Sequence, residues 1–135
     1  MSSRRNRGMF WLLPPAALVV AAGAIFAEYR YEQHDMREKA EALTGGDIDR
    51  GESAFLAYGC GGCHSISGIS QGKVGPALDG IGAQAIIGGR LENKPENLMR
   101  WIAHPQSVAP GTAMPNLGVR PNDARDIAAF LYMQS

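Results

Sequence analysis

Cysteine and histidine are scarce in this sequence: its 135 residues include two cysteines and three histidines. A structural zinc site needs four ligands, usually as two Cys/His pairs, and His34 and His104 stand at unsuitable spacings for a second pair. The sequence shows no convincing run of alternating apolar and polar residues, which is the pattern that indicates β-strands. Basic residues are not in excess either, because 13 Lys and Arg balance 13 Asp and Glu. These scarcities count against zinc modules, βαβ redox domains and nucleic-acid-binding proteins.

The two cysteines stand together in Cys60-Gly61-Gly62-Cys63-His64, the C-x-x-C-H pentapeptide that attaches a c-type haem. On one helical turn the sulfurs of Cys60 and Cys63 point the same way, so both can bond to the edge of one porphyrin. His64 then becomes the proximal iron ligand. The alternatives are a zinc site and a thiol–disulfide redox pair, which would also use C-x-x-C. The predicted cofactor is one covalent haem c, bound at Cys60, Cys63 and His64.

A long uncharged run, residues 9–27, follows three arginines within the first seven residues. As a helix this run would span about 28 Å, close to the roughly 30 Å hydrocarbon core of a bilayer. The positive-inside rule then predicts a basic cytoplasmic N-terminus over 1–8, a transmembrane anchor over 9–27, and a haem domain on the periplasmic side of the bacterial inner membrane. A cleaved signal peptide is the alternative, since Ala-Gly-Ala at 22–24 is a possible cleavage pattern, but the apolar run exceeds the usual length.

Residues 28–46 are dense in charge and in good helix formers. They predict an exposed helical linker that ends at Gly45-Gly46, a C-cap and domain boundary. A new helix is then expected to begin at Asp47 or Asp49, where Glu52 stands three residues after Asp49 in a capping-box arrangement.

The remaining residues, 47–135, predict a small domain of short helices. The expected helices run from residue 47 or 49 to about Gly59, from Pro95 to residue 104, and from Pro121 or Asn122 onward. Residues 65–94 are rich in glycine and show no long helical or alternating pattern. We expect this loop to wrap the porphyrin, and a second loop to join Pro105 to the last helix.

Taken together, these features resemble class I c-type cytochromes, a family of all-α domains in which three to five short helices enclose one haem. The resemblance rests on Gly51 and Phe55 in the first helix, the pentapeptide at 60–64, Gly75-Pro76, Met114-Pro115, and Ile127-x-x-Phe130-Leu131. It implies that Cys60 and Cys63 form the thioether bonds, that His64 and Met114 are the axial iron ligands, and that the Pro76 carbonyl accepts a hydrogen bond from His64. It also implies that Phe55 packs near Phe130.

The sixth ligand can also be considered from the residues themselves. Met114 lies in a loop bounded by proline and glycine, Pro110 to Pro115, which would hold one side chain in place. His104 is the alternative ligand, although a histidine at the end of a helix is ordinarily a surface residue. With both axial positions filled by His64 and Met114, the expected activity is one-electron transfer, with no catalysis and no small-molecule substrate.

A closer likeness concerns residues 88–119, which are similar to the cytochrome domain fused to subunit II of caa-type haem–copper oxidases. This implies respiratory partners: a haem–copper oxidase or a quinol–cytochrome c reductase. We therefore expect a membrane-anchored cytochrome that is a subunit of, or tethered donor to, a terminal oxidase or quinol-oxidising complex. The alternatives are the haem subunit of a periplasmic dehydrogenase and a haem gas sensor.

Overall fold

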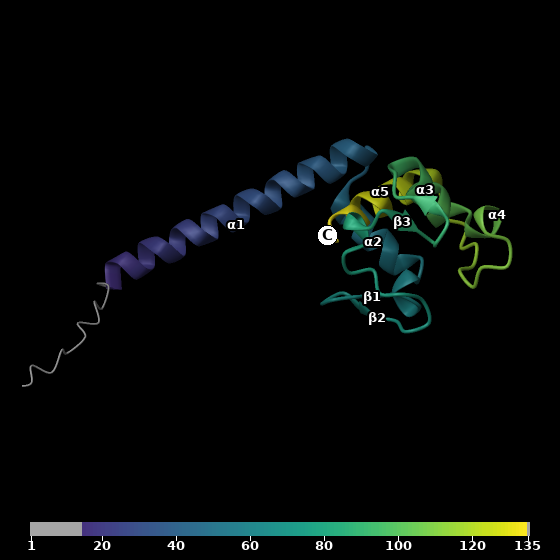
Figure 1. Ribbon diagram of the computed structural model, residues 1–135, viewed down its shortest axis with the longest axis horizontal. Coiled ribbons are helices and arrows are strands. Elements are labelled where there is room, and N and C mark those ends of the chain that lie inside the picture. Colours follow the sequence, from purple (N-terminus) through teal and green to yellow (C-terminus); the bar gives the residue numbers. More distant parts are fainter. Residues whose placement is uncertain (1–14, 135) are drawn as a thin grey trace, which may run out of the picture. The chain divides into compact units, whose positions relative to one another are not determined.

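The computed structural model describes residues 15–134, which fall into two compact units, one up to His34 and one from Asp35 onward. The α-helices are α1 (Pro15–Thr44), α2 (Ile48–Ala57), α3 (Pro95–Ala103), α4 (Pro105–Val108) and α5 (Pro121–Tyr132) (Figure 1). Two short 3₁₀ turns are η1 (Cys60–Gly62) and η2 (Ile81–Ala83). Two small hairpins pair β1 (Ser65–Ile66) with β2 (Ser70–Gln71) and β3 (Ile86–Ile87) with β4 (Leu91–Glu92). The predicted helical domain is therefore confirmed, with two hairpins added to it.

The crossing of α2 and α5 forms the centre of the second unit. Gly51 lies against the backbone of Asp126, and the rings of Phe55 and Phe130 pack at a centroid distance of 5.6 Å. Both rings are almost fully buried. The predicted contact between Phe55 and Phe130 is confirmed, and it fixes the end of α2 that leads to Cys60.

The last helix presents its predicted apolar face to this core. Buried residues on α5 are Ala124, Ile127, Ala128, Ala129, Phe130 and Leu131. From α3, Leu98 and Ile102 join the same cluster. Prolines begin α3 and α5 as the sequence predicts, because the first turn of a helix has no use for the missing N–H. Pro105 begins α4 in the same way, although residues 105–108 were expected to belong to a loop.

The hairpins correct the expectation of a domain without strands. Each hairpin supplies one nearly fully buried isoleucine to the core, Ile66 from β1 and Ile87 from β3. Two residues per strand are too few to produce an alternating pattern in the sequence. Directly after β4, Asn93 holds the segment between the two hairpins: its Nδ2 donates to the carbonyls of Ile81 and Gln84, and its Oδ1 accepts from the Tyr132 hydroxyl.

The last part of α1 belongs to the second unit. Ala40 and Thr44 are buried, and Glu41 accepts a hydrogen bond from the Ile48 amide at 3.3 Å. Arg37 forms an ion pair with Asp49 at 2.9 Å. The predicted linker over 28–46 is therefore not an exposed rod along its whole length, because its C-terminal part packs on the domain. The helix ends before Gly45, whose φ of 68° fits the predicted C-cap.

The structure shows which of the two predicted aspartates, Asp47 or Asp49, caps the start of α2. Asp47 is the N-cap, and its side chain accepts a hydrogen bond from the Arg50 amide at 2.8 Å. Asp49 instead lies in the first turn. The predicted capping box between Asp49 and Glu52 is therefore wrong, because Asp47 has no Glu or Gln at the third position.

No helix within residues 15–134 combines the length and the hydropathy that a membrane crossing requires. The described part of the predicted anchor is the segment 15–27, after which Glu28 introduces charge. That segment is shorter than the roughly 20 residues of a spanning helix. The beginning of the predicted anchor, residues 9–14, and the predicted N-terminus, residues 1–8, lie outside the described residues.

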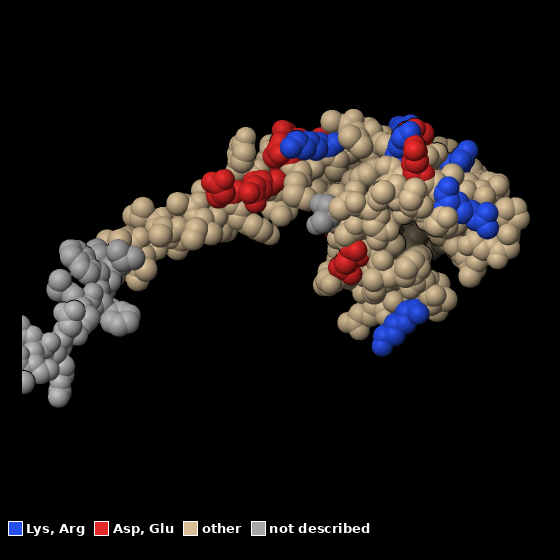
Figure 2. Space-filling view, in the orientation of Figure 1, with Lys and Arg blue, Asp and Glu red and all other residues tan. Residues whose placement is uncertain are grey.

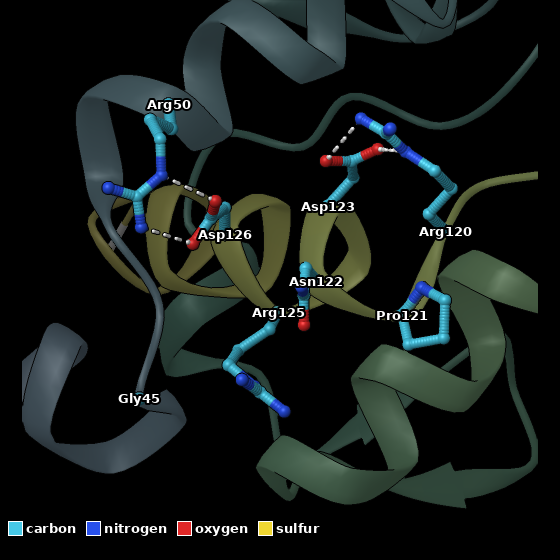
Figure 3. A pocket seen from close by; sticks show the side chains of 8 residues that line it. All are labelled: Gly45, Arg50, Arg120, Pro121, Asn122, Asp123, Arg125 and Asp126. Atoms are coloured by element: carbon cyan, nitrogen blue, oxygen red, sulfur yellow. Dashed lines mark hydrogen bonds and ion pairs between the residues drawn. The ribbon is translucent and has the colours of Figure 1, made fainter.

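A charged network joins the start of α2 to α5 (Figure 3). The Asp126 carboxylate accepts hydrogen bonds from Arg50 Nε at 2.9 Å, from Arg50 Nη2 at 3.1 Å and from the Asp47 amide at 2.8 Å. Burial raises the pKa of Asp126, but the hydrogen bonds and the charge of Arg50 outweigh burial and lower that pKa below 3.8. The ionised carboxylate therefore stabilises the fold.

Replacing Asp126 by asparagine is expected to lower the free energy of unfolding at neutral pH by about 2 kcal/mol, because charge-assisted hydrogen bonds are lost. The folded-state pKa of Asp126 is depressed, so its contribution is present above the unfolded-state pKa and is lost as pH falls through the folded-state value. Urea unfolding should thus show that the difference in stability between wild type and D126N becomes smaller below about pH 4.

Asp49→Asn, at a side chain that is 79% exposed, is the control for this prediction and should change stability by less than about 0.5 kcal/mol. Equal losses in both variants would contradict this role.

Candidate haem site

The pentapeptide occupies a tight turn directly after α2. Gly59 has a φ of 76° and turns the chain from the end of α2 into η1. The Cys60 carbonyl then accepts hydrogen bonds from the amides of Cys63 at 3.1 Å and His64 at 2.9 Å. These two bonds bring both cysteines and the histidine into one turn, as the spacing predicts.

The two thiols are free and half-buried, and no disulfide joins them. Burial raises the pKa of the Cys60 thiol, and the neighbouring Cys63 raises it further. A reactive redox cysteine has the opposite property, a lowered pKa that favours the thiolate. Within residues 15–134, no three His, Cys, Asp or Glu side chains are grouped to hold a metal ion. Two free thiols in one turn with His64 fit the haem attachment that the pentapeptide predicts.

His64 is oriented by the segment that follows β2. Its Nδ1 lies 2.8 Å from the Pro76 carbonyl oxygen. A carbonyl oxygen can only accept, so Nδ1 is the donor, and in the neutral imidazole Nε2 then has its lone pair available for a metal. Gly75 lies flat against the ring, because a Cβ there would approach His64 Cε1 to 2.5 Å.

A second set of hydrogen bonds supports the backbone of this turn. The Cys63 carbonyl accepts from the amides of Val74 at 3.1 Å and Gly75 at 2.8 Å. The Ser70 hydroxyl donates to the His64 carbonyl at 2.9 Å and accepts from the Ile66 amide at 3.0 Å. Sequence analysis missed Ser70, since one serine in a glycine-rich loop has no recognisable pattern.

Met114 lies on a separate loop between α4 and α5, half-buried. Gly111 in this loop has a φ of 84°, and the Thr112 hydroxyl oxygen lies 3.4 Å from the Met114 amide. The Gln106 side chain donates to the carbonyls of Thr112 and Met114. His104, the alternative ligand, is exposed at the junction of α3 and α4. Sequence analysis missed Gln106 because α4 itself was missed.

The residues present fit a covalent haem. Two free thiols stand in one turn with an imidazole whose Nε2 is available, and a thioether is held on another loop. Large apolar side chains are exposed in the same unit, among them Val74 beside Gly75 and Leu117 beyond Met114, at 79% and 40%. An apolar macrocycle is the kind of group that would cover such side chains. When bound, haem supplies an iron that gains and loses one electron.

A hollow of about 680 Å³ lies elsewhere, at the start of α5 (Figure 3). Its lining residues are Gly45, Arg50, Arg120, Pro121, Asn122, Asp123, Arg125 and Asp126. None of the predicted haem residues is among them. Asp123 is held there by Arg120 at 2.7 Å and by the Tyr58 hydroxyl at 2.6 Å, so the hollow belongs to the packing of α2 against α5.

Charge is evenly divided over the haem domain. Residues 47–135 carry seven Lys and Arg and eight Asp and Glu. On the face shown in Figure 2, Lys and Arg side chains are scattered over the folded unit. The composition and this view give no sign of the lysine-rich face that would steer a partner over long distances.

Comparisons with known proteins agree with this site. The sequence model of the family described as "Cytochrome c" matches residues 48–134. "Cytochrome c oxidase subunit 2" of Alkalihalophilus pseudofirmus is 36% identical over 88 residues, which is 65% of this chain and 25% of that protein. The same subunit of Bacillus sp. (strain PS3) is 34% identical over 138 residues, and the match covers 81% of this chain and 38% of that protein. "Cytochrome c2" of Agrobacterium tumefaciens is 30% identical over 106 residues, and the match covers 67% of this chain and 94% of that protein.

This chain spans 25% and 38% of the length of the two oxidase subunits and nearly all of the cytochrome c2. No solved structure matches it significantly. The match to the family model covers α2 to α5 and includes the pentapeptide, Pro76 and Met114. The chain therefore belongs to the cytochrome c family, electron carriers with covalently bound haem c.

Proposed function

We propose that this chain carries single electrons on the periplasmic side of a bacterial respiratory chain, as a membrane-anchored subunit of, or tethered donor to, a terminal oxidase or quinol-oxidising complex. The observation that carries the electron-transfer part is the hydrogen bond from His64 to Pro76, in the same turn as two free thiols. This bond fixes the orientation of the ring and leaves Nε2 as the nitrogen that can bind a metal.

In this proposal Met114 and His64 would together hold the haem iron. A thioether is a soft, neutral ligand that favours Fe(II) over Fe(III), so His/Met ligation raises the reduction potential. With His64 and Met114 both bound to the iron, the haem would supply one-electron transfer, and small molecules would find no open coordination site. This distinguishes the proposal from a gas sensor.

The anchor is supported by the first half of α1. Its large apolar side chains Leu18, Val19, Val20, Ile25 and Phe26 are all more than half exposed. Such a run of exposed apolar residues indicates contact with a membrane or a partner. Tyr29 and Tyr31 follow it, also exposed, where an interfacial aromatic belt would lie. The three arginines in the first seven residues support a periplasmic haem domain, because the positive-inside rule associates such basic residues with the cytoplasmic side.

The oxidase context is supported by the relatives named cytochrome c oxidase subunit 2. Both match this chain over a part of their length only, so the likeness concerns the haem module. The balanced charge of the domain also favours a tethered carrier, since tethering replaces electrostatic steering by a high effective concentration.

Met114→Ala in the full-length holoprotein is expected to abolish the far-red sulfur-to-iron charge-transfer band of the oxidised form and to allow the reduced form to bind CO. The physical reason is that the proposal assigns iron ligation to the Met114 thioether, which alanine lacks. Met99→Ala is the control, because Met99 packs against the core from α3, and this variant should keep the band. A band that survives Met114→Ala would refute Met114 as the ligand.

The partner is tested by copurification of the full chain from membranes of its natural host. A haem–copper oxidase or a quinol-oxidising complex is expected in the purified material. Recovery with only a substrate dehydrogenase would overturn the respiratory assignment and favour the dehydrogenase alternative.

A further inference from the structure

We propose that Gln106 is a positioning residue for Met114: its side-chain amide holds the methionine loop in the shape that keeps the thioether on the iron. This inference rests on the proposed function, in which Met114 is an axial ligand. It concerns a residue of α4, a helix that precedes the methionine loop and contains none of the predicted haem residues.

The contacts of Gln106 reach three places in this loop. Its Nε2 donates to the Thr112 carbonyl at 2.6 Å and to the Met114 carbonyl at 2.9 Å. Its backbone amide donates to Asn116 Oδ1 at 3.3 Å. One residue therefore holds the loop before, at and after the predicted ligand.

Gln106 can hold the loop because its own position is fixed. Pro105, directly before it, is almost fully buried. The turn of α4 is tied at its start by the His104 carbonyl, which accepts from the Ser107 hydroxyl at 2.9 Å and from the Ser107 amide at 3.1 Å. Through the hydrogen bonds of Gln106, the irregular methionine loop is attached to α4, whose own backbone is held in place.

The chemistry requires the amide group. The NH₂ of glutamine provides two donors, and the two carbonyl oxygens can only accept. Glutamate has the same length but offers no donor when ionised, and one when protonated. Leucine has similar bulk and offers none. Losing these bonds leaves the loop free to adopt other conformations, in which Met114 is away from the iron.

The experiment measures CO binding by the reduced full-length holoprotein, because CO binds only when the sixth ligand leaves. The apparent CO affinity then reports the fraction of molecules in which the Met114 position is open. Two hydrogen bonds contribute about 1.4 kcal/mol or more together, so Gln106→Leu and Gln106→Glu are each expected to raise the apparent CO affinity at least about tenfold at neutral pH. Gln71→Leu, at an exposed residue of β2, should leave it unchanged.

The pH profile separates positioning from a general loss of structure. In Gln106→Glu, protonation of the carboxyl group restores one donor, so the apparent CO affinity should fall toward wild type as pH decreases. Gln106→Leu should show no such decrease. Asn116→Ala, which removes only the bond to the Gln106 amide, should give a smaller rise and serves if the Gln106 variants fold poorly.

The inference is overturned if Met114→Ala opens the iron to CO while both Gln106 variants bind CO as weakly as wild type. It is also overturned if Gln106→Glu and Gln106→Leu share one pH profile, or if Asn116→Ala, which leaves the Gln106 side-chain amide in place, raises the CO affinity as much as Gln106→Leu does. A different result, in which Met114→Ala itself leaves CO binding and the far-red band unchanged, would refute the ligand assignment on which the inference rests.

Discussion

Replacing Gly51 by leucine is expected to abolish the cooperative fold of the haem domain. A Cβ at this position would collide with the Asp126 carbonyl oxygen and would lie 2.6 Å from the Asp126 carbonyl carbon and 2.8 Å from Phe130 Cβ. Two of these three atoms belong to the backbone of α5, which no side-chain rotation can move. The helices α2 and α5 would have to separate.

The alanine variant gives a graded measurement. Overpacking a well-packed core costs roughly 1–3 kcal/mol when side chains can shift, and a collision with backbone lies at the upper end or beyond it. We expect Gly51→Ala to lose about 3 kcal/mol or more in the free energy of unfolding, measured by urea denaturation of the holoprotein.

Gly62→Ala is the matched control for this prediction. No described atom lies within 4 Å of a Cβ built at Gly62, and its φ is not positive. It should change stability by less than about 0.5 kcal/mol. Equal stability of Gly51→Ala and Gly62→Ala would show that α2 and α5 can move apart at little cost.

The effect of Gly51 would reach the haem site through Phe55. The contact of Phe55 with Phe130 holds the second half of α2, and η1 with Cys60 follows that half directly. A displaced α2 therefore displaces the turn that binds the haem. This links the helix crossing to the geometry of His64.

Sequence reasoning predicted the features that depend on local chemistry. Proline at the first turn located the starts of α3 and α5, and the pentapeptide located the turn of His64, because both follow from the properties of neighbouring residues. The resemblance to class I cytochromes added Pro76, whose carbonyl lies at hydrogen-bond distance from His64 as expected. The helix starts and the contact between His64 and Pro76 are confirmed, and the roles of these residues toward the haem stay predictions.

Most of the features that were missed depend on residues far apart in the chain. Asp47 is favoured as the cap of α2 partly because Asp126, on α5, accepts a hydrogen bond from the Asp47 amide. The residues next to Asp47 in the sequence give no sign of this distant partner. The hairpins are stabilised by the burial of Ile66 and Ile87 in the common core. Tertiary contacts of this kind leave no periodicity to detect. Gln106 was missed for a more local reason, because α4 was not predicted and the carbonyls that Gln106 contacts, six and eight residues away, lie in an irregular loop.

The second large effect is expected for the double variant Cys60→Ala/Cys63→Ala, which should lose covalent haem and cooperative unfolding together. A domain of this size has a modest apolar core. In the described structure Val74, Ile86 and Leu117 are exposed, and a small domain that leaves such residues uncovered needs an additional stabilising element.

The measurement is thermal unfolding of the purified variant followed by far-ultraviolet circular dichroism, with refolding from urea if the variant does not accumulate in cells. We expect residual helix from α2 and α5, which pack on each other through Phe55 and Phe130, and a broad transition in place of a sharp one. Ser53→Ala, at an exposed position on α2, should retain both haem and a sharp transition. A sharp transition in the haem-free double variant would mean that the polypeptide core is sufficient by itself, and that the haem serves electron transfer without supporting the fold.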